Sequence, residues 1–192
     1  MKKIGLLLVF VSVIGAAVAQ HAPFREYGFY GTASYTMLTN VNRSTYTFLL
    51  NGVNVTGGFQ IRPKTCVELG VGFLGDSKGV FSQVPLTLGL RTHYLDNWIT
   101  PTTELYAGYS FFLKKRGDNS NGDKMQINSG GVTAGVNVGA RMTVSRKLAV
   151  NVYVGWQFFM VNEFEVFDQQ KNTLLKDSWA PHCFRFGLGL MF

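Results

Sequence analysis

Alternation of apolar with small or polar residues constrains this chain more than any other feature. In the ten-residue stretch CFRFGLGLMF, which ends the chain, Phe184, Phe186, Leu188, Leu190 and Phe192 share one parity. The other parity holds a cysteine, an arginine, two glycines and a methionine. An extended strand with this pattern has one apolar face and one small or polar face.

The same period-two pattern recurs along the chain. After the N-terminal apolar run, no segment has a helical period or is apolar for long enough to span a bilayer as a helix. We predict eight strands, at residues 27–35, 53–62, 66–73, 84–91, 104–111, 132–141, 148–158 and 183–192. The connectors between them are short at 62–64, 95–101 and 145–147, and long at 39–52, 74–83, 113–131 and 164–181. Short and long connectors therefore lie at opposite ends of the predicted sheet.

Glycine distinguishes a soluble sandwich from a barrel. Glycine is unfavourable inside strands, yet eleven glycines of the predicted strands share the polar parity, and only Gly31 and Gly57 share the other. A sandwich needs bulky residues on its buried face, whereas a narrow closed barrel needs small residues inside. The apolar face must then point into lipid, where an unpaired sheet edge is not tolerated, so the last strand must pair with the first. The predicted fold is all-β: a closed, eight-stranded, antiparallel, up-and-down transmembrane β-barrel with a filled polar lumen.

The N-terminal segment MKKIGLLLVFVSVIGAAVAQ has the features of a secretory signal peptide. Two lysines precede an apolar run, and a small-x-small triplet at 17–19 predicts cleavage before Gln20. The run is short for a membrane anchor. Loss of Lys2 and Lys3 leaves 16 basic against 11 acidic residues, a net charge of +5. This charge favours an anionic lipid surface and is too diffuse for nucleic acid. Residues 20–192 suit a single barrel domain.

With these features the chain resembles the small eight-stranded outer-membrane β-barrels, the class of OmpX and of the OmpA transmembrane domain. The resemblance rests on the export signal, the eight alternating segments, the connector lengths and the terminal FGLGLMF. It implies a place in the outer membrane of a Gram-negative cell envelope, among outer-membrane lipid and lipopolysaccharide. It also implies that Phe192 belongs to the signal read by the barrel-assembly machinery.

Ionisable residues on the inward parity form a candidate lumenal network. Charges in a narrow lumen are costly unless they are paired. We therefore expect Arg–Glu pairs, with inward tyrosines such as Tyr30, Tyr106 and Tyr153, to plug the barrel. A proton path, or a small ion or solute pore lined by the same residues, is the alternative. The predicted network is Arg62, Glu68, Arg91, His93, Glu104 and Arg141 near the short connectors, with Glu163 and Arg185 toward the other rim.

The longest hairpin tip offers two surface motifs. Lys114, Lys115 and Arg116 follow a lipid-facing strand, at the height where lipopolysaccharide phosphates would lie, and attraction there needs only charge. Arg116, Gly117 and Asp118 form a tripeptide that resembles integrin ligands, and they suit a protein partner at the long connectors. The spacing of the oxygen-bearing residues that follow departs from a calcium loop, so no metal or other cofactor is predicted.

Some relatives in this fold class act on lipid A, with a histidine beside a serine or an acid near the outer rim. His182 follows a connector that carries Asp177 and Ser178, so a lipid-A-modifying enzyme is an alternative function. A lone histidine beside a proline is also typical of a girdle or loop residue. Because no nucleophile, metal or phosphate motif converges elsewhere, the sequence favours a barrel without turnover, which stabilises the envelope or presents its long connectors as a binding surface.

The two cysteines are predicted to remain free. Cys66 opens the third strand beside a short connector, and Cys183 opens the eighth strand beside a long one. The membrane belt between the two rims is about 25 Å tall, whereas a disulfide requires Cα atoms within roughly 7 Å. Both thiols share the inward parity, which shields them from other chains.

Overall fold

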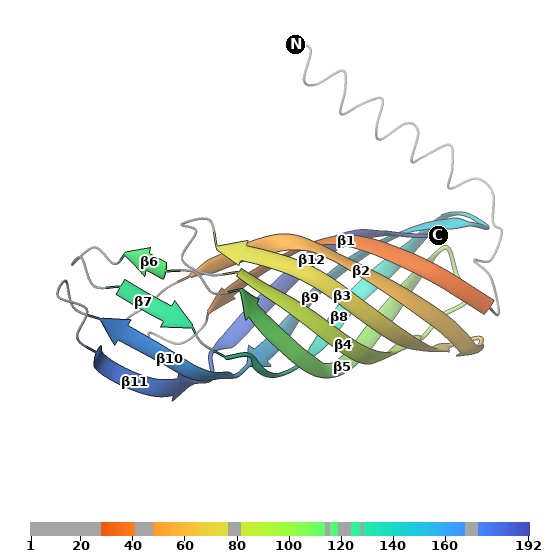
Figure 1. Ribbon diagram of the computed structural model, residues 1–192. Helices are drawn as coiled ribbons and strands as arrows, with labels where there is room; N and C mark the ends of the chain where they lie inside the picture. The colour runs from red at the N-terminus through yellow and green to blue at the C-terminus, as the bar shows by residue number, and fades with distance from the viewer. Residues whose placement is uncertain are drawn as a thin grey trace, which may run out of the picture.

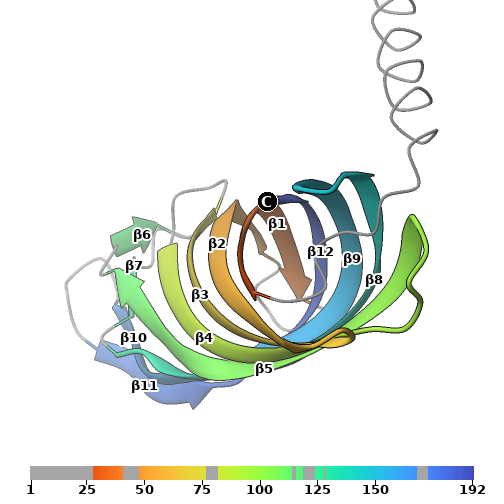
Figure 2. The same cartoon turned by 90° about the vertical axis from the view of Figure 1, so that its right-hand side faces the viewer.

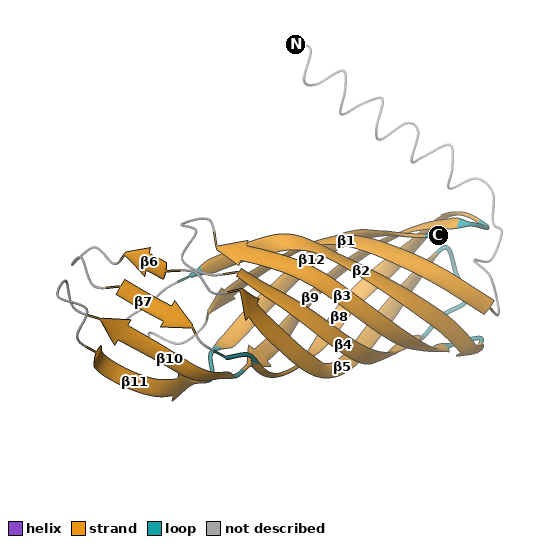
Figure 3. Ribbon diagram, viewed as in Figure 1, coloured by secondary structure: helices purple, strands orange, loops and turns teal. Residues whose placement is uncertain are grey.

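The computed structural model describes residues 28–40, 48–76, 82–113, 116–118, 124–127, 129–167 and 173–192. Figure 3 shows these residues as strands joined by turns. Within them, no helix has the length and apolar character needed to cross a membrane. The strands are β1 (Gly28–Asn40), β2 (Leu49–Arg62), β3 (Thr65–Asp76), β4 (Ser82–His93), β5 (Ile99–Leu113), β6 (Arg116–Asp118), β7 (Lys124–Ile127), β8 (Gly131–Ser145), β9 (Leu148–Phe159), β10 (Val161–Phe167), β11 (Thr173–Trp179) and β12 (His182–Met191).

Eight strands close into an antiparallel barrel in the order β1-β12-β9-β8-β5-β4-β3-β2 (Figures 1 and 2). The seam joins β1 to β12, from Thr32 opposite Met191 to Asn40 opposite Cys183. It ends in a pair of backbone hydrogen bonds between Gly31 and Phe192, of 2.8 and 2.9 Å. The predicted closed, eight-stranded antiparallel barrel, including pairing of the last strand with the first, is confirmed.

Side chains of the barrel wall point alternately outward and inward, as the sequence pattern predicts. Outward residues are apolar and exposed, as for Leu88 (60%) and Leu105 (61%), whereas inward polar residues such as Thr36 and Thr133 are fully buried. A soluble protein has the opposite arrangement, with its apolar side chains inside. The outer face of this barrel is therefore suited to hydrocarbon rather than water.

Several strands extend beyond their predicted ends toward the long connectors. β1 continues to Asn40 and β2 begins at Leu49, where the prediction placed a connector. The difference arises because Leu38 and Leu50 are apolar yet point inward, with no exposed surface. They interrupt the alternation on which the prediction depends.

A second, four-stranded sheet was not predicted. It has the order β11-β10-β7-β6 and is built from hairpins inside two of the long connectors. β7 and β10 join the hairpins, for example at Gln126 opposite Glu165. In Figure 1 this sheet lies beyond the left end of the barrel, away from the C-terminus. The long-connector end is thus extended by a structured platform.

Candidate functional site

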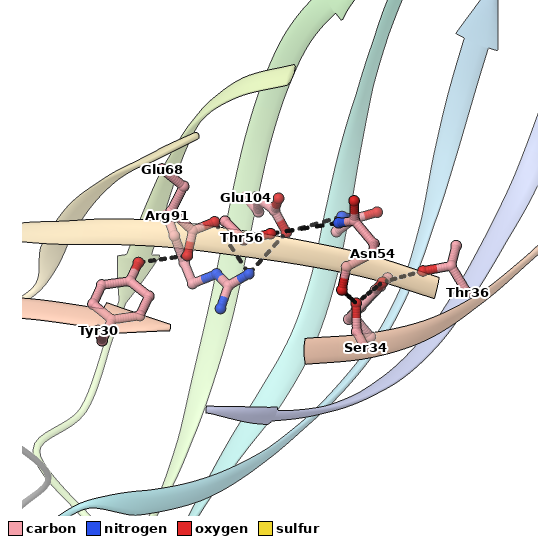
Figure 4. A network of polar contacts seen from close by, with 10 residues as sticks. Tyr30, Ser34, Thr36, Asn54, Thr56, Glu68, Arg91 and Glu104 are labelled. Atoms are coloured by element: carbon pink, nitrogen blue, oxygen red, sulfur yellow. Dashed lines mark hydrogen bonds and ion pairs between the residues drawn. The ribbon is translucent and has the colours of Figure 1, made fainter. Parts of the chain in front are cut away.

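The centre of the lumen holds a group of five residues that we call the charged cluster: Tyr30, Glu68, Arg91, Glu104 and Asn137. The Nη2 atom of Arg91 lies 3.2 Å from Oε2 of Glu68 and 3.3 Å from Oε2 of Glu104. Asn137 donates to the same Glu104 oxygen at 3.0 Å, and the Tyr30 hydroxyl donates to Oε1 of Glu68. Figure 4 shows the side chains of Tyr30, Glu68, Arg91 and Glu104 converging from separate strands. One guanidinium therefore forms ion pairs with two carboxylates.

The positions of these residues follow from strand register. Arg91 lies directly opposite Glu104 across β4 and β5, and Glu104 lies opposite Asn137 across β5 and β8. Glu68 of β3 is opposite Gly89, two residues from Arg91, so it reaches the guanidinium diagonally. Arg91 and Glu68 have only 4% and 2% of their surface exposed. Charges buried this deeply are stable only as a complete set.

Each of the tyrosines Tyr30, Tyr106 and Tyr153 lies across a glycine of the neighbouring strand and contacts a polar partner on the strand beyond it. We call this arrangement a tyrosine bridge. A Cβ atom on the central glycine would overlap the tyrosine ring or hydroxyl at all three bridges. The inward glycines therefore provide the space that these rings occupy, as expected for a narrow barrel. The bridges are Tyr30–Gly58–Glu68, Tyr106–Gly135–Gln157 and Tyr153–Gly187–Thr36.

The bridges hold Arg185 between aromatic rings. Its guanidinium carbon lies 4.7 Å from the ring centroid of Tyr106 and 5.4 Å from that of Tyr153. The tyrosines are fixed by their far partners, since Tyr106 donates to Gln157 at 3.0 Å and the hydroxyls of Tyr153 and Thr36 are 2.8 Å apart. Cation–π contacts of this kind favour a buried guanidinium. Arg185 thus lies in the middle of the lumen, farther from the rim than predicted.

Apolar side chains fill the lumen at the long-connector end. We call this group the mouth cluster. Phe159 is fully buried, and its ring centroid lies 6.0 Å from that of Phe48 and 5.7 Å from that of Phe112. Apart from the inward position of Cys183, this cluster was not predicted, although bulky apolar residues on the inward parity are a usable signal. Its buried members are Leu38, Phe48, Leu50, Leu74, Phe159, Val161 and Cys183.

A small cavity separates the mouth cluster from the residues below it. Leu74 lines it from the mouth side, and Arg185 and Tyr106 line it from the centre. The volume open to the centre of a water-sized sphere is about 10 Å³, roughly what one water molecule requires.

The short-turn end holds the remaining predicted lumenal residues. His93 (2% exposed) and Arg141 (7% exposed) are buried inside the barrel. Arg62 is exposed, so its assignment to the lumen is wrong. The register shifts between Gln60 and Arg62, and such a bulge bends the strand and turns the side chain that follows away from its expected face. Glu163 lies in β10, but its side chain is outside the described residues.

The histidine of the proposed catalytic group lies on the outer wall of the barrel. His182 points outward and its ring stacks on Trp156, with centroids 5.2 Å apart and planes at 20°. Phe158 lies against the same histidine at 6.5 Å, so three aromatic rings lie together on the outer wall. Ser178 is exposed in β11, and the side chain of Asp177 is outside the described residues. This geometry fits the girdle interpretation of His182.

The surface motifs are described only in part. Lys114 and Lys115 lie outside the described residues, as do Gln20 and the predicted signal peptide. Arg116, Gly117 and Asp118 form β6, an edge strand of the second sheet, without described side chains.

The structure also shows the arrangement of possible metal ligands and the state of the two cysteines. In the described part of the chain, no group of three or more histidine, cysteine or acidic residues is placed to hold a metal ion. Cys66 and Cys183 are both free and buried, as predicted. Cys183 belongs to the mouth cluster, whereas Cys66 packs with Tyr30 and Met191 toward the other end.

Comparison with known proteins places the fold among small outer-membrane barrels. No protein-family model and no curated protein sequence matches the chain. The structure is similar to the crystal structure of Neisserial surface protein A (NspA), with a TM-score of 0.59, 11% sequence identity and coverage of 85% of this chain and 96% of that one. It is also similar to the outer membrane protein OprG from Pseudomonas aeruginosa, with a TM-score of 0.60, 14% identity and coverage of 88% and 98%. Identities this low establish the shared fold alone.

Proposed function

We propose that this protein is an integral outer-membrane barrel with a closed lumen that acts without turnover, by stabilising the envelope or by presenting its long connectors as a binding surface. The observation that carries the proposal is the reversed distribution of side chains, with large apolar residues exposed on the outer wall and polar residues buried inside. Only a hydrocarbon environment makes that distribution favourable.

The membrane assignment is tested by fractionation. The protein should remain in the outer-membrane fraction after urea extraction, and its gel mobility should change on heating as the barrel unfolds. A denaturing gel of unheated and heated membranes measures both properties. Recovery as a soluble periplasmic monomer contradicts the proposal.

Closure of the lumen is supported by two filled regions, the charged cluster and the mouth cluster, with space for about one water molecule between them. Purified protein in planar bilayers should therefore show at most small and rare conductance events. Large, steady steps would instead favour the ion or solute pore. The same recordings thus separate the structural role from transport.

The long connectors are the proposed interaction surface. The second sheet supports this role because it orders two of these connectors into one platform. Lys114, Lys115 and Arg116 remain our candidates for lipopolysaccharide contact, and Arg116, Gly117 and Asp118 for a protein partner. Pull-down with wild-type protein, compared with a variant in which 116–118 are alanine, tests the second role: capture that is unchanged in the variant excludes the tripeptide.

Two further roles remain proposals. Phe192 is our candidate for the assembly signal, and its exposed position at the seam leaves the ring accessible (56%). The lipid-A-modifying enzyme is disfavoured by the stacked ring of His182. Mass spectra of lipid A from a deletion strain should show an unchanged acylation pattern. An altered pattern would support the enzymatic function instead.

A further inference from the structure

The short-turn end of the barrel carries an uneven distribution of charge. Two tight hairpins present basic pairs, and all four side chains are exposed. Arg62 ends β2 and Lys64 lies in the turn that follows, whereas Arg146 and Lys147 lie between β8 and β9. Asp96 is the acidic residue of the intervening β4–β5 connector. Its carboxylate lies 3.7 Å from the Lys64 ammonium. In the described residues, Arg62, Arg146 and Lys147 form no ion pair with a carboxylate.

These cations lie directly beyond the apolar belt. Phe59 and Ile61 precede Arg62 on the outer wall with 44% and 53% of their surface exposed, and Phe59 packs against Phe29 with ring centroids 4.8 Å apart. Aromatic residues of this kind mark the membrane–water interface. Basic side chains one or two residues farther along reach the level of the lipid phosphates, because their long stems extend along the apolar surface.

Hydrogen bonds hold the backbone of the β2–β3 turn and of the β4–β5 connector. The carbonyl of Lys64 accepts from the amide of His93 at 2.8 Å, and the carbonyl of Pro63 accepts from the Gln60 side chain at 2.7 Å. The carbonyl of Trp98 accepts from the amide of Thr143 at 2.7 Å, which ties the intervening connector to β8. Little ordering of the backbone is then needed when a ligand binds.

We infer that the short-turn end binds the phosphate groups of anionic phospholipids at two places, one at Arg62 and Lys64 and the other at Arg146 and Lys147. The β2–β3 and β8–β9 hairpins are separated in the barrel by β4 and β5 on one side and by β1 and β12 on the other. They therefore contact different lipids of the same leaflet. Guanidinium and ammonium groups are strong partners of phosphate oxygens. The inference rests on the proposed membrane location, in which short turns face the periplasm.

The test measures lipid selectivity at the surface of the inserted barrel. Wild-type protein is reconstituted in phosphatidylcholine vesicles, and electron spin resonance gives the affinity of spin-labelled phosphatidylglycerol relative to spin-labelled phosphatidylcholine. We expect a preference for phosphatidylglycerol that falls by about fivefold for each removed cation that contacts a headgroup. The variants are Arg62→Gln/Lys64→Gln, Arg146→Gln/Lys147→Gln and the fourfold combination. The fourfold variant should lose most of the preference.

The control is Lys124→Gln/Lys176→Gln, which removes the same charge from β7 and β11 of the second sheet, beyond the end of the barrel. Equal losses in this control and in the turn variants would show a general effect of net charge and would overturn the inference. Heat-modifiable mobility is measured for every sample. Failure of the wild-type protein to insert counts against the membrane location itself, whereas insertion without preference for phosphatidylglycerol counts against the headgroup sites alone.

Discussion

The mouth cluster and the charged cluster occupy one lumen, but they depend on their members in different ways. In the mouth cluster each side chain contributes burial and packing, and its neighbours need no particular partner. In the charged cluster the Arg91 guanidinium serves two carboxylates, so its removal leaves both of them without a cation. Residues that are buried to a similar degree can therefore differ in how much stability a single substitution removes.

The largest expected effect is that of Arg91→Gln. The substitution leaves Glu68 and Glu104 buried without their counter-ion, and we expect the free energy of unfolding to fall by about 3–5 kcal/mol. Urea unfolding of the protein in phospholipid vesicles, followed by tryptophan fluorescence, provides the measurement. Arg146→Gln is the control, because that side chain is exposed and its loss should change the stability by less than about 0.5 kcal/mol.

A triple variant shows whether charge causes this loss. Glu68→Gln/Arg91→Met/Glu104→Gln removes all three charges while keeping side chains of similar volume. It should recover most of the stability lost in Arg91→Gln, because no uncompensated charge remains. If the triple variant is as unstable as the single one, packing of the Arg91 side chain rather than its charge holds the cluster together.

A smaller loss is expected from Phe159→Ala in the mouth cluster. The substitution opens a cavity that lipid cannot reach, and we expect a decrease of about 3 kcal/mol in the same unfolding measurement. The control is Phe186→Ala on the outer face (48% exposed), where mobile hydrocarbon fills the space and the decrease should be smaller. Planar-bilayer recordings of Phe159→Ala should remain without steady conductance, because the charged cluster still fills the centre. Steady conductance would show that the mouth cluster alone closes the lumen.

The sequence predicts the barrel wall well because one repeating pattern determines it. Each strand alternates between lipid and lumen, so the outward face and the closure of β1 on β12 follow from parity and from the absence of water in a bilayer. The pattern fails where a local feature interrupts it. Leu38 is apolar on the inward face, and a bulge turns Arg62 outward.

The contents of the lumen are harder to predict because they depend on register between strands. The sequence identifies Glu68, Arg91 and Glu104 as inward charges, but only the pairing of β3, β4 and β5 brings all three together. The second sheet depends on pairing between β7 and β10, which are far apart in the sequence and short. Short segments carry little periodic signal, so no local pattern indicates this contact.

The smallest effect, and the finest test of the comparison, concerns the glycine beneath Tyr30. Gly57 and Gly58 are neighbours in β2, but a Cβ atom at Gly57 would meet nothing within 4 Å, whereas one at Gly58 would overlap the ring of Tyr30. Gly58→Ala should displace the ring that donates to Glu68 and lower the free energy of unfolding by about 1–3 kcal/mol. Gly57→Ala should leave stability unchanged or raise it by up to about 1 kcal/mol, because alanine loses less backbone entropy in a strand.

In a Tyr30→Leu background the cost of Gly58→Ala should shrink, since the smaller side chain can move aside, and a double-mutant cycle measures that coupling. Equal costs in both backgrounds would mean that the glycine serves the β2 backbone rather than the tyrosine bridge, and that the charged cluster does not depend on it.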